Sequence, residues 1–184
     1  MKYINPDIES SYKANNIGQT LYDLVLRIKP KKIIEFGTLN GYSAVSMAMA
    51  LHELNNGGKI ICYDLWESYH YKHSTIEKTK QNISKYPLID FIELKQMNMD
   101  DWNIEDFDLL HIDVSNDGKT ISEMYKKMHD RIKNGSVVVF EGGSEERDNV
   151  EWMIKHNKVP INSIRKNIDY TILNQDFPSI SQIL

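Results

Sequence analysis

The sequence has little cysteine and no long apolar run. Cys62 is its one cysteine, so an internal disulfide is excluded. No apolar stretch approaches the roughly 20 residues of a membrane span. The opening MKYINPDIES lacks the basic and then apolar pattern of a signal peptide. These absences predict a cytoplasmic protein with no membrane partner.

Basic charge is also scarce. The chain has 22 Lys and Arg against 26 Asp and Glu, a formal net charge of −4. This balance disfavours nucleic acid as a partner, because such proteins usually carry a strongly basic face. His70 and His73 are three residues apart but lack the cysteine or histidine partners of a zinc site. The remaining expectation is a small-molecule partner.

What the sequence does contain is an alternation of helical and strand patterns over 184 residues, enough for one domain, 1–184, with a core. Helical spacing covers 17–28, 41–54, 74–86, 119–132 and 146–157, and apolar strand patterns cover 31–36, 59–65, 89–96, 107–113, 136–141, 161–166 and 169–174. The alternation predicts an α/β fold, a doubly wound, mostly parallel seven-stranded sheet with helices on both faces.

In such a sheet, ligands bind at the carboxyl ends of the strands. The first strand runs into IIEFGTLNGYSA, where Gly37 and Gly41 are four apart. This spacing is neither the dinucleotide pattern G-x-G-x-x-G nor a phosphate-binding Walker loop. Glu35 would repel a pyrophosphate, but it suits an ammonium group. The glycine spacing alone is typical of a tight turn; Glu35 and Ser43 favour a bound ligand.

The next two strand ends carry further polar groups. Asp64 ends the second strand, where a carboxylate is placed to accept hydrogen bonds from ribose hydroxyls, and Trp66 follows as a surface on which a base could stack. After the third strand, an adenine could be held by Asn98 with Met99 or by Asp100. A solvated loop acid at position 64 and a helix cap near position 100 are the structural alternatives.

The last two parallel strands end in carboxylates. Asp113 ends the fourth strand and Glu141 the fifth, so the two could pair around a divalent metal. Glu141 could equally accept a hydrogen bond from substrate or from a loop amide. His111, inside the fourth strand, is better interpreted as a packed core residue than as a catalyst.

Together these residues resemble a class I S-adenosylmethionine-dependent methyltransferase, from about Ile17 to the chain end. The family motif E/D-x-G-x-x-x-G is EFGTLNG here, and the continuation GYS with the upstream GQTLYDLVLRIKP is similar to the small-molecule O-methyltransferase branch. Macrocin O-methyltransferase and cephalosporin hydroxylase relatives belong to that branch. The resemblance implies a Rossmann-like sheet whose last two strands form an antiparallel hairpin, which 161–166 and 169–174 fit.

The resemblance also implies roles for the matching residues. Glu35, Gly37 and Gly41 would cradle the methionine part of the cofactor, Asp64 the ribose, and Asn98, Met99 or Trp66 the adenine. The full implied cofactor set is Glu35, Gly37, Thr38, Gly41, Tyr42, Ser43, Asp64, Leu65, Trp66, Asn98, Met99 and Asp113. Asp113 and Glu141 would be catalytic, and they would also hold a divalent metal (Mg) if one is present.

The chain departs from this family in two places. Relatives often carry a stretch close to IDGDHSY after the fourth strand, whereas this chain has IDVSNDG, with Ser115, Asn116 and Gly118 at the acid, histidine and tyrosine positions. A ready general base is therefore missing. Metal-dependent relatives place two ligands after the fifth strand, and here Gly142 follows Glu141. Asp117, Glu145 or Asp148 would have to substitute, so metal dependence is left open.

The leading hypothesis is S-adenosylmethionine-dependent methyl transfer to an oxygen of a small metabolite, with Asp113 as base or metal ligand. The alternative is a cofactor-binding protein of the same fold with little or no transferase activity. A nucleic-acid methyltransferase is disfavoured, because the Asn/Asp-Pro-Pro-aromatic motif of base-modifying enzymes is absent. The N-terminal segment 1–16 and the aromatic loop 66–73 are expected to cover the site, and a homodimer could complete it.

Overall fold

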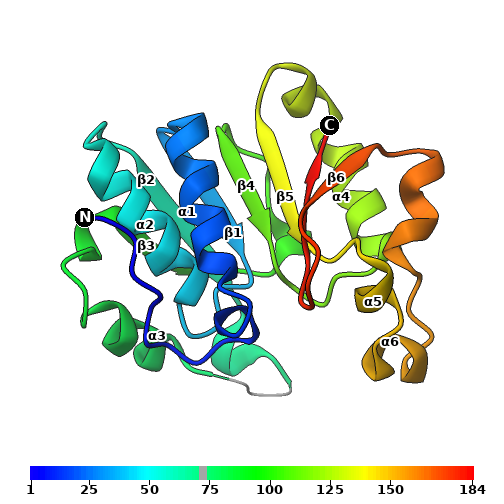
Figure 1. Ribbon diagram of the computed structural model, residues 1–184, viewed down its shortest axis with the longest axis horizontal. Helices are drawn as coiled ribbons and strands as arrows, with labels where there is room; N and C mark the ends of the chain where they lie inside the picture. The colour runs from blue at the N-terminus through cyan, green and yellow to red at the C-terminus, as the bar shows by residue number, and fades with distance from the viewer. Residues whose placement is uncertain (71–73) are drawn as a thin grey trace. The chain divides into compact units, whose positions relative to one another are not determined.

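The computed structural model describes residues 1–70 and 74–184. They form a seven-stranded sheet in the order β3-β2-β1-β4-β5-β7-β6 (Figure 1). The strands are β1 (Lys32–Phe36), β2 (Lys59–Asp64), β3 (Ile92–Gln96), β4 (Leu109–Ile112), β5 (Val137–Glu141), β6 (Tyr170–Asn174) and β7 (Ile180–Ile183). β1, β2 and β3 run parallel, while β7 is antiparallel to both β5 and β6. The predicted fold class, including its antiparallel C-terminal hairpin, is confirmed.

The α-helices alternate with these strands. They are α1 (Ile17–Ile28), α2 (Tyr42–Leu54), α3 (Ile76–Ile83), α4 (Gly118–Lys133), α5 (Glu145–Asp148) and α6 (Glu151–Lys155). Short 3-10 helices are η1 (Ser11–Lys13), η2 (Trp66–Ser68), η3 (Ile89–Phe91), η4 (Met99–Asp101) and η5 (Ile161–Lys166). In the described parts of the chain, no helix is both long enough and apolar enough to cross a membrane.

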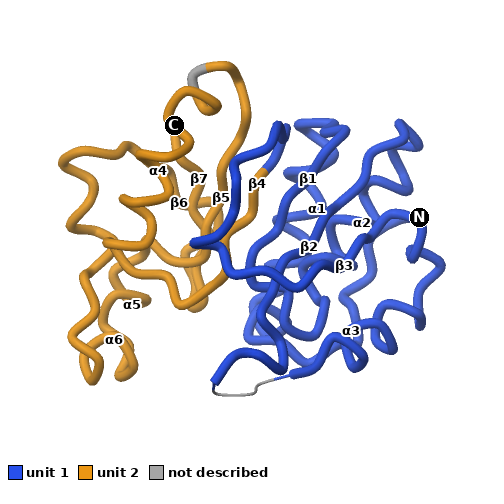
Figure 2. The backbone as a smooth tube through the Cα atoms, turned by 180° about the vertical axis from the view of Figure 1, so that it is seen from behind, with its two compact units in different colours: residues 1–109 blue, residues 110–184 orange. Residues whose placement is uncertain are grey.

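The chain divides into two compact units, residues 1–109 and 110–184 (Figure 2). In the first unit, β1 is buried from Ile33 to Phe36, and α1 packs against α2. The parallel register pairs Glu35 with Cys62 and Phe36 with Tyr63. The loops that leave the carboxyl ends of β1 and β2 are therefore neighbours.

The second unit corrects two sequence predictions. Residues 161–166 were expected to be a strand, but they form η5, because both oxygens of Asp148 accept backbone N–H bonds, from Ile161 and Asn162, each at 2.7 Å. The buried residues of η5, Ile161 and Ile164, recur at the three-residue period of a 3-10 helix. The last strand is instead β7, which the sequence reading missed.

The predicted helix over 146–157 is also broken. It is split into α5 and α6, and Val150 between them adopts an extended conformation with ψ 148°. The Asn149 side chain donates to the Glu145 carbonyl at 2.8 Å and so closes α5. Asp148, the last residue of α5, is thereby held where its carboxylate caps η5.

Candidate cofactor and acceptor site

The loop after β1 is a tight turn built on two glycines. Gly37 and Gly41 have φ angles of 88° and 93°, in the left-handed region that favours glycine. The Gly37 N–H donates to the Tyr63 carbonyl at 3.0 Å, and the Gly41 N–H donates to the Thr38 carbonyl at 2.8 Å. A Cβ added to Gly41 would lie 3.3 Å from Cγ1 of Ile83. The loop therefore needs glycine for its backbone angles and for its close packing on α3.

Leu39, in the middle of this loop, is pinned from both sides. Its φ of 48° is left-handed, a conformation that costs a non-glycine residue about 1–2 kcal/mol. Its N–H donates to Oδ2 of Asp64 at 2.7 Å. Its carbonyl accepts bonds from Nε1 of Trp66, at 3.0 Å, and from the Thr79 hydroxyl. These three bonds hold the strained residue and brace the glycine loop from within the chain.

Asp64 lies at the end of β2, where the sequence predicted a ribose ligand. Each of its oxygens accepts one backbone N–H: Oδ2 from Leu39, and Oδ1 from Trp66 at 2.8 Å. A carboxylate oxygen can accept two hydrogen bonds. Since the side chain is half-buried, one lone pair on each oxygen is left for hydroxyl donors. Asp64 thus braces the loop and keeps the capacity to bind a diol.

Trp66 supports the loop rather than standing open beside it. Its residue is 2% exposed, and its indole N–H donates to both the Leu39 carbonyl and Oγ1 of Thr79, each at 3.0 Å. This geometry assigns the ring a place beneath the loop. The expected stacking on an adenine stays a prediction, and it would require the buried ring to move.

Glu35 is fully buried at the end of β1. Burial raises the pKa of the Cys62 thiol, and the neighbouring Glu35 carboxyl raises it further. The Thr38 hydroxyl lies beside the same thiol. Cys62 is therefore a protonated, inert core residue, and the Glu35 and Thr38 side chains beside it are buried as well.

Asn40 is a residue of the loop that the sequence reading missed. Its side chain donates to the Glu9 carbonyl at 3.1 Å and accepts from the Ser74 hydroxyl at 2.7 Å. Its own carbonyl accepts from Nδ2 of Asn82 at 3.1 Å. Three segments distant in sequence thus meet on one loop residue, and no local pattern signals this.

The start of α2 is tied to the N-terminal segment. Tyr42 and Ser43 are both buried. The Tyr42 hydroxyl donates to Oδ1 of Asn5 at 2.7 Å, and the Tyr3 hydroxyl donates to Oδ1 of Asn16 at 2.6 Å. The segment before α1 is therefore fastened to the helix that follows the glycine loop.

The loops after β2 and β3 are joined as well. Nε2 of Gln96 donates to the Leu65 carbonyl at 2.9 Å and to the Ser68 hydroxyl at 2.8 Å. Asn98 is exposed, and its side chain caps η4 by accepting the N–H of Asp100 at 3.1 Å, while Met99 is half-buried. The helix-cap alternative from the sequence thus applies, with Asn98 rather than Asp100 or Asp101 as the capping residue.

In the second unit, polar groups cluster after β4 and β5. Glu141 is buried and accepts two bonds from Arg147 on α5: from Nε to Oε1, and from Nη2 to Oε2 at 3.0 Å. Burial raises the pKa of the Glu141 carboxyl, and the Arg147 guanidinium offsets part of this rise. Fork-shaped pairing of this kind fixes both side chains in one geometry.

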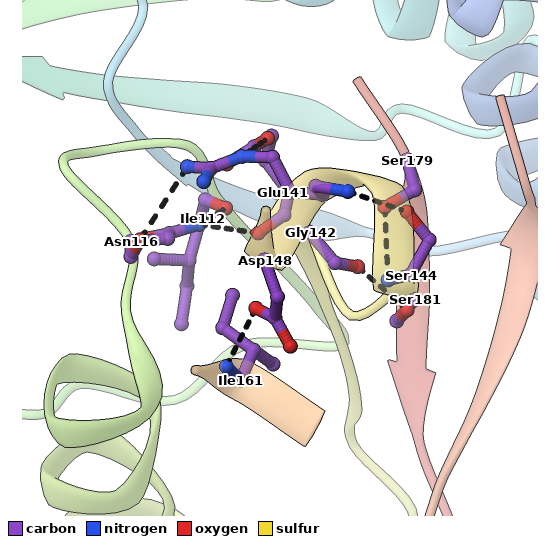
Figure 3. A network of polar contacts seen from close by, with 10 residues as sticks. Ile112, Asn116, Glu141, Gly142, Ser144, Asp148, Ile161, Ser179 and Ser181 are labelled. Atoms are coloured by element: carbon purple, nitrogen blue, oxygen red, sulfur yellow. Dashed lines mark hydrogen bonds and ion pairs between the residues drawn. The ribbon is translucent and has the colours of Figure 1, made fainter. Parts of the chain in front are cut away.

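Asn116 joins the two strand ends (Figure 3). Its Nδ2 donates to the carbonyls of Ile112 and Glu141, each at 2.9 Å, and its own carbonyl accepts from Nη2 of Arg147 at 3.4 Å. Asp113, in the intervening turn, is half-buried, whereas His111 in β4 is fully buried, as expected for a core residue. Asn116 and Arg147 were not predicted as site residues.

The turn after β5 is glycine-rich and packed against β7. Gly142 and Gly143 have φ angles of 108° and 99°. The Gly142 carbonyl accepts from the Ser181 hydroxyl at 2.7 Å, and the Gly143 carbonyl accepts from the Tyr170 hydroxyl at 3.1 Å. The chain thus turns sharply enough for α5 to place Arg147 over Glu141.

Comparison with known proteins now decides the family. A family profile described as "Methyltransferase domain" matches residues 34–141, more than half of the chain. The chain belongs to this methyltransferase family. The resemblance that the glycine motif suggested is confirmed. The comparison with curated proteins gives no match.

Solved methyltransferase structures share the fold. A putative O-methyltransferase from Klebsiella pneumoniae superposes with a TM-score of 0.63 at 17% identity, over 91% of this chain and 79% of that one. The O-methyltransferase from Bacillus cereus in complex with SAH gives 0.62 at 17% identity, over 98% and 84%. TomG from Streptomyces achromogenes, in complex with SAM, gives 0.58 at 16%, over 97% and 82%.

The acidic side chains expected to replace a missing metal ligand have other partners or are exposed. Asp117 caps α4 by accepting the Thr120 N–H at 2.8 Å, Asp148 caps η5, and Glu145 is exposed. Within residues 1–70 and 74–184, no group of three or more His, Cys, Asp or Glu could hold a metal ion. The donors proposed to replace a missing metal ligand are thus committed elsewhere or point to solvent.

One predicted feature lies outside the described residues. The aromatic loop over 66–73 was expected to cover the site, and its residues 71–73, His73 among them, are not described. The part that is described is well tied. Glu67 accepts the Ile76 N–H at 3.0 Å, and Ser68 is held by Gln96.

Proposed function

We propose that this methyltransferase uses S-adenosylmethionine to methylate an oxygen of a small metabolite. The observation that carries the proposal is the glycine loop, whose shape is braced by Asp64 through two backbone hydrogen bonds. Similar solved structures add support: the Bacillus cereus O-methyltransferase is in complex with SAH, and TomG is in complex with SAM.

The residues of the first unit fit such a cofactor. Gly37 carries no side chain to block a close approach of the ligand to the backbone, and Gly41 allows the loop to pack closely on α3. Asp64 has lone pairs left for two ribose hydroxyls, and the Glu35 carboxyl at the end of β1 is the proposed partner of the ammonium end. Thr38, Tyr42, Ser43 and Leu65 flank these groups, and Asn98 and Met99 remain the proposed adenine contacts.

The bound cofactor supplies a methyl group on a sulfonium. The chain supplies orientation and a path for the acceptor proton. Asp113, half-buried just after β4, is the proposed proton acceptor. Asn116 and Glu141 fix the ends of β4 and β5 on either side of this turn, so the carboxylate is presented from a rigid frame.

Calorimetric titration of the intact chain with S-adenosylmethionine tests the cofactor assignment. We expect one saturable site, weakened about 10-fold to 100-fold in Asp64→Ala, because the loop brace and the ribose ligand are lost together. Asp90→Ala, at an exposed aspartate of η3, is the matched control and should leave the affinity unchanged. Unchanged affinity in Asp64→Ala would refute the ribose assignment.

A cofactor-binding protein with little transferase activity is the second candidate. It is favoured by Asn116, which stands where relatives carry a histidine, and by the engagement of Glu141 with Arg147. Tight cofactor binding without S-adenosylhomocysteine formation across a broad panel of small-molecule hydroxyl acceptors would select it. Turnover that is lost in Asp113→Ala would select the enzyme.

The proposal extends to access, assembly and location. The N-terminal segment 1–16 would cover the cofactor, since Glu9 contacts the loop residue Asn40 and Asn5 contacts Tyr42. A cytoplasmic location and a homodimer complete the proposal. Light scattering of the purified chain tests the dimer, and a single-chain mass would exclude it.

A further inference from the structure

The ion pair at the end of β5 involves Glu141, the residue that the family resemblance implied as a metal ligand. The exposed fractions of the Arg147 and Glu141 side chains are 8% and 7%. The pair lies beside Asn116, which spans the ends of β4 and β5 (Figure 3). Any role of the Glu141 carboxylate in the reaction must therefore include its contact with the Arg147 guanidinium.

This arrangement does not fit a divalent metal. A magnesium ion needs carboxylate oxygens at about 2.0–2.1 Å in an octahedral shell. Both Glu141 oxygens already accept bonds from Arg147, and a second cation placed beside the guanidinium would be repelled. The next residue, Gly142, has no side chain to offer as a ligand. The Ser144 hydroxyl is not free to bind a metal either, because it caps α5 by accepting the backbone N–H of Arg147.

Arg147 has a donor left over. A guanidinium carries five N–H donors, and Nε and Nη2 account for the bonds to Glu141 and to the Asn116 carbonyl. Nη1 is buried and has no hydrogen-bond partner among the residues described. A buried donor without a partner is unfavourable, so the position suits an oxygen that binds during function.

We infer that Arg147, held by Glu141, takes the place of a divalent metal on the acceptor side, with Nη1 donating to the acceptor oxygen. The inference rests on the proposed methyl transfer and deepens it. Because Glu141 balances the charge of Arg147, the site does not select for an anion. A single hydroxyl group suffices, whereas chelation by a metal favours two adjacent oxygens.

The proposed step is a displacement at the methyl carbon of the cofactor. The acceptor oxygen forms a bond to the methyl carbon as the bond from that carbon to sulfur breaks, and the electron pair of the broken bond stays on sulfur. The hydroxyl proton passes to the Asp113 carboxylate. Nη1 of Arg147 stabilises the negative charge that develops on the acceptor oxygen, the role that preorganised donors play in other group transfers.

Manganese binding, followed by electron paramagnetic resonance on the intact chain with S-adenosylhomocysteine present, tests the metal part without any turnover. We expect the wild type to leave the free Mn²⁺ signal unchanged through the millimolar range. The inference would be overturned if the wild type bound one Mn²⁺ per chain, and if this binding were lost in Glu141→Gln but kept in the matched control Glu146→Gln. Glu146 is an exposed neighbour on α5.

Turnover tests the donor. S-adenosylhomocysteine formation from a panel of single-hydroxyl acceptors should be the same with EDTA as with Mg²⁺. Arg147→Met should lower this rate about 100-fold or more, and Arg147→Lys should restore part of it, while cofactor affinity stays within about twofold in both. A rate that requires Mg²⁺, or a full rate in Arg147→Met, would overturn the inference. Failure of the wild type to bind the cofactor would instead refute the proposed function, so the two failures are distinguishable.

Discussion

The two units build their strand-end sites from different materials. In the first, Asp64 accepts only backbone amides, so the loop's shape depends on chain geometry and on glycines at positions 37 and 41. In the second, Glu141 is held by the side chain of Arg147 from the α5 helix. A site held by backbone hydrogen bonds can be recognised in the sequence as a short motif. A site held by a buried side-chain pair cannot, because it depends on where a later helix packs.

The largest difference between the two units is expected when the cation of an ion pair is removed from each. Arg147→Met leaves a buried carboxylate without its cation, so the free energy of unfolding should fall by about 3–5 kcal/mol. Lys32→Met removes the half-exposed ion pair with Glu105 in the first unit and should cost about 1 kcal/mol or less. Urea denaturation measures both, and equal losses would show that the buried pair is no more important to stability than the half-exposed one.

Substitution of a turn glycine should also reduce stability more in the second unit than in the first. A Cβ on Gly143 would contact the Ser181 hydroxyl and lie 2.8 Å from Cε2 of Tyr170, whereas one on Gly41 would keep 3.3 Å to its nearest neighbour. Gly143→Ala should therefore cost about 2–4 kcal/mol of stability, and Gly41→Ala about 1–2 kcal/mol. Only Gly41→Ala should also weaken cofactor binding. Thermal melts and calorimetry would sharpen or undo this contrast.

Acid should rescue the Arg147 variant. Burial raises the Glu141 pKa above its ordinary 4.5, and loss of Arg147 removes the group that opposes this rise. The folded state then binds more protons than the unfolded state, so stability falls as the pH rises from about 4.5 through the folded pKa. The slope approaches about 1.4 kcal/mol for each pH unit. Arg147→Met should gain stability from pH 8 to pH 5 relative to wild type, and parallel profiles would contradict this.

A smaller effect than that of Arg147→Met or Gly143→Ala is expected at Trp66. Trp66→Phe keeps a buried ring but removes the N–H that donates to Leu39 and Thr79. We expect a loss of about 1 kcal/mol in stability and a similar weakening of cofactor binding, because the Leu39 carbonyl keeps one of its two donors. Weakening of cofactor binding well beyond this would instead favour direct stacking of the tryptophan on the adenine.

The sequence predicted the site residues of the first unit better than those of the second. The glycine motif, Asp64 and the strands of the first unit could be predicted because each depends on a local pattern. Arg147 could not, because an arginine in an acidic run gives no sign that it folds back over β5. The strand predicted at 161–166 failed for a similar reason: β-branched isoleucines favour a strand, and the Asp148 carboxylate that caps η5 comes from another helix.

The most direct test of the account is amide chemical-shift mapping of the isotopically labelled chain titrated with S-adenosylhomocysteine. The account predicts saturable shifts that are largest for residues 37–41 and 64–66, the backbone that Asp64 braces. Saturable binding with its largest shifts elsewhere, or no binding at all, would contradict it.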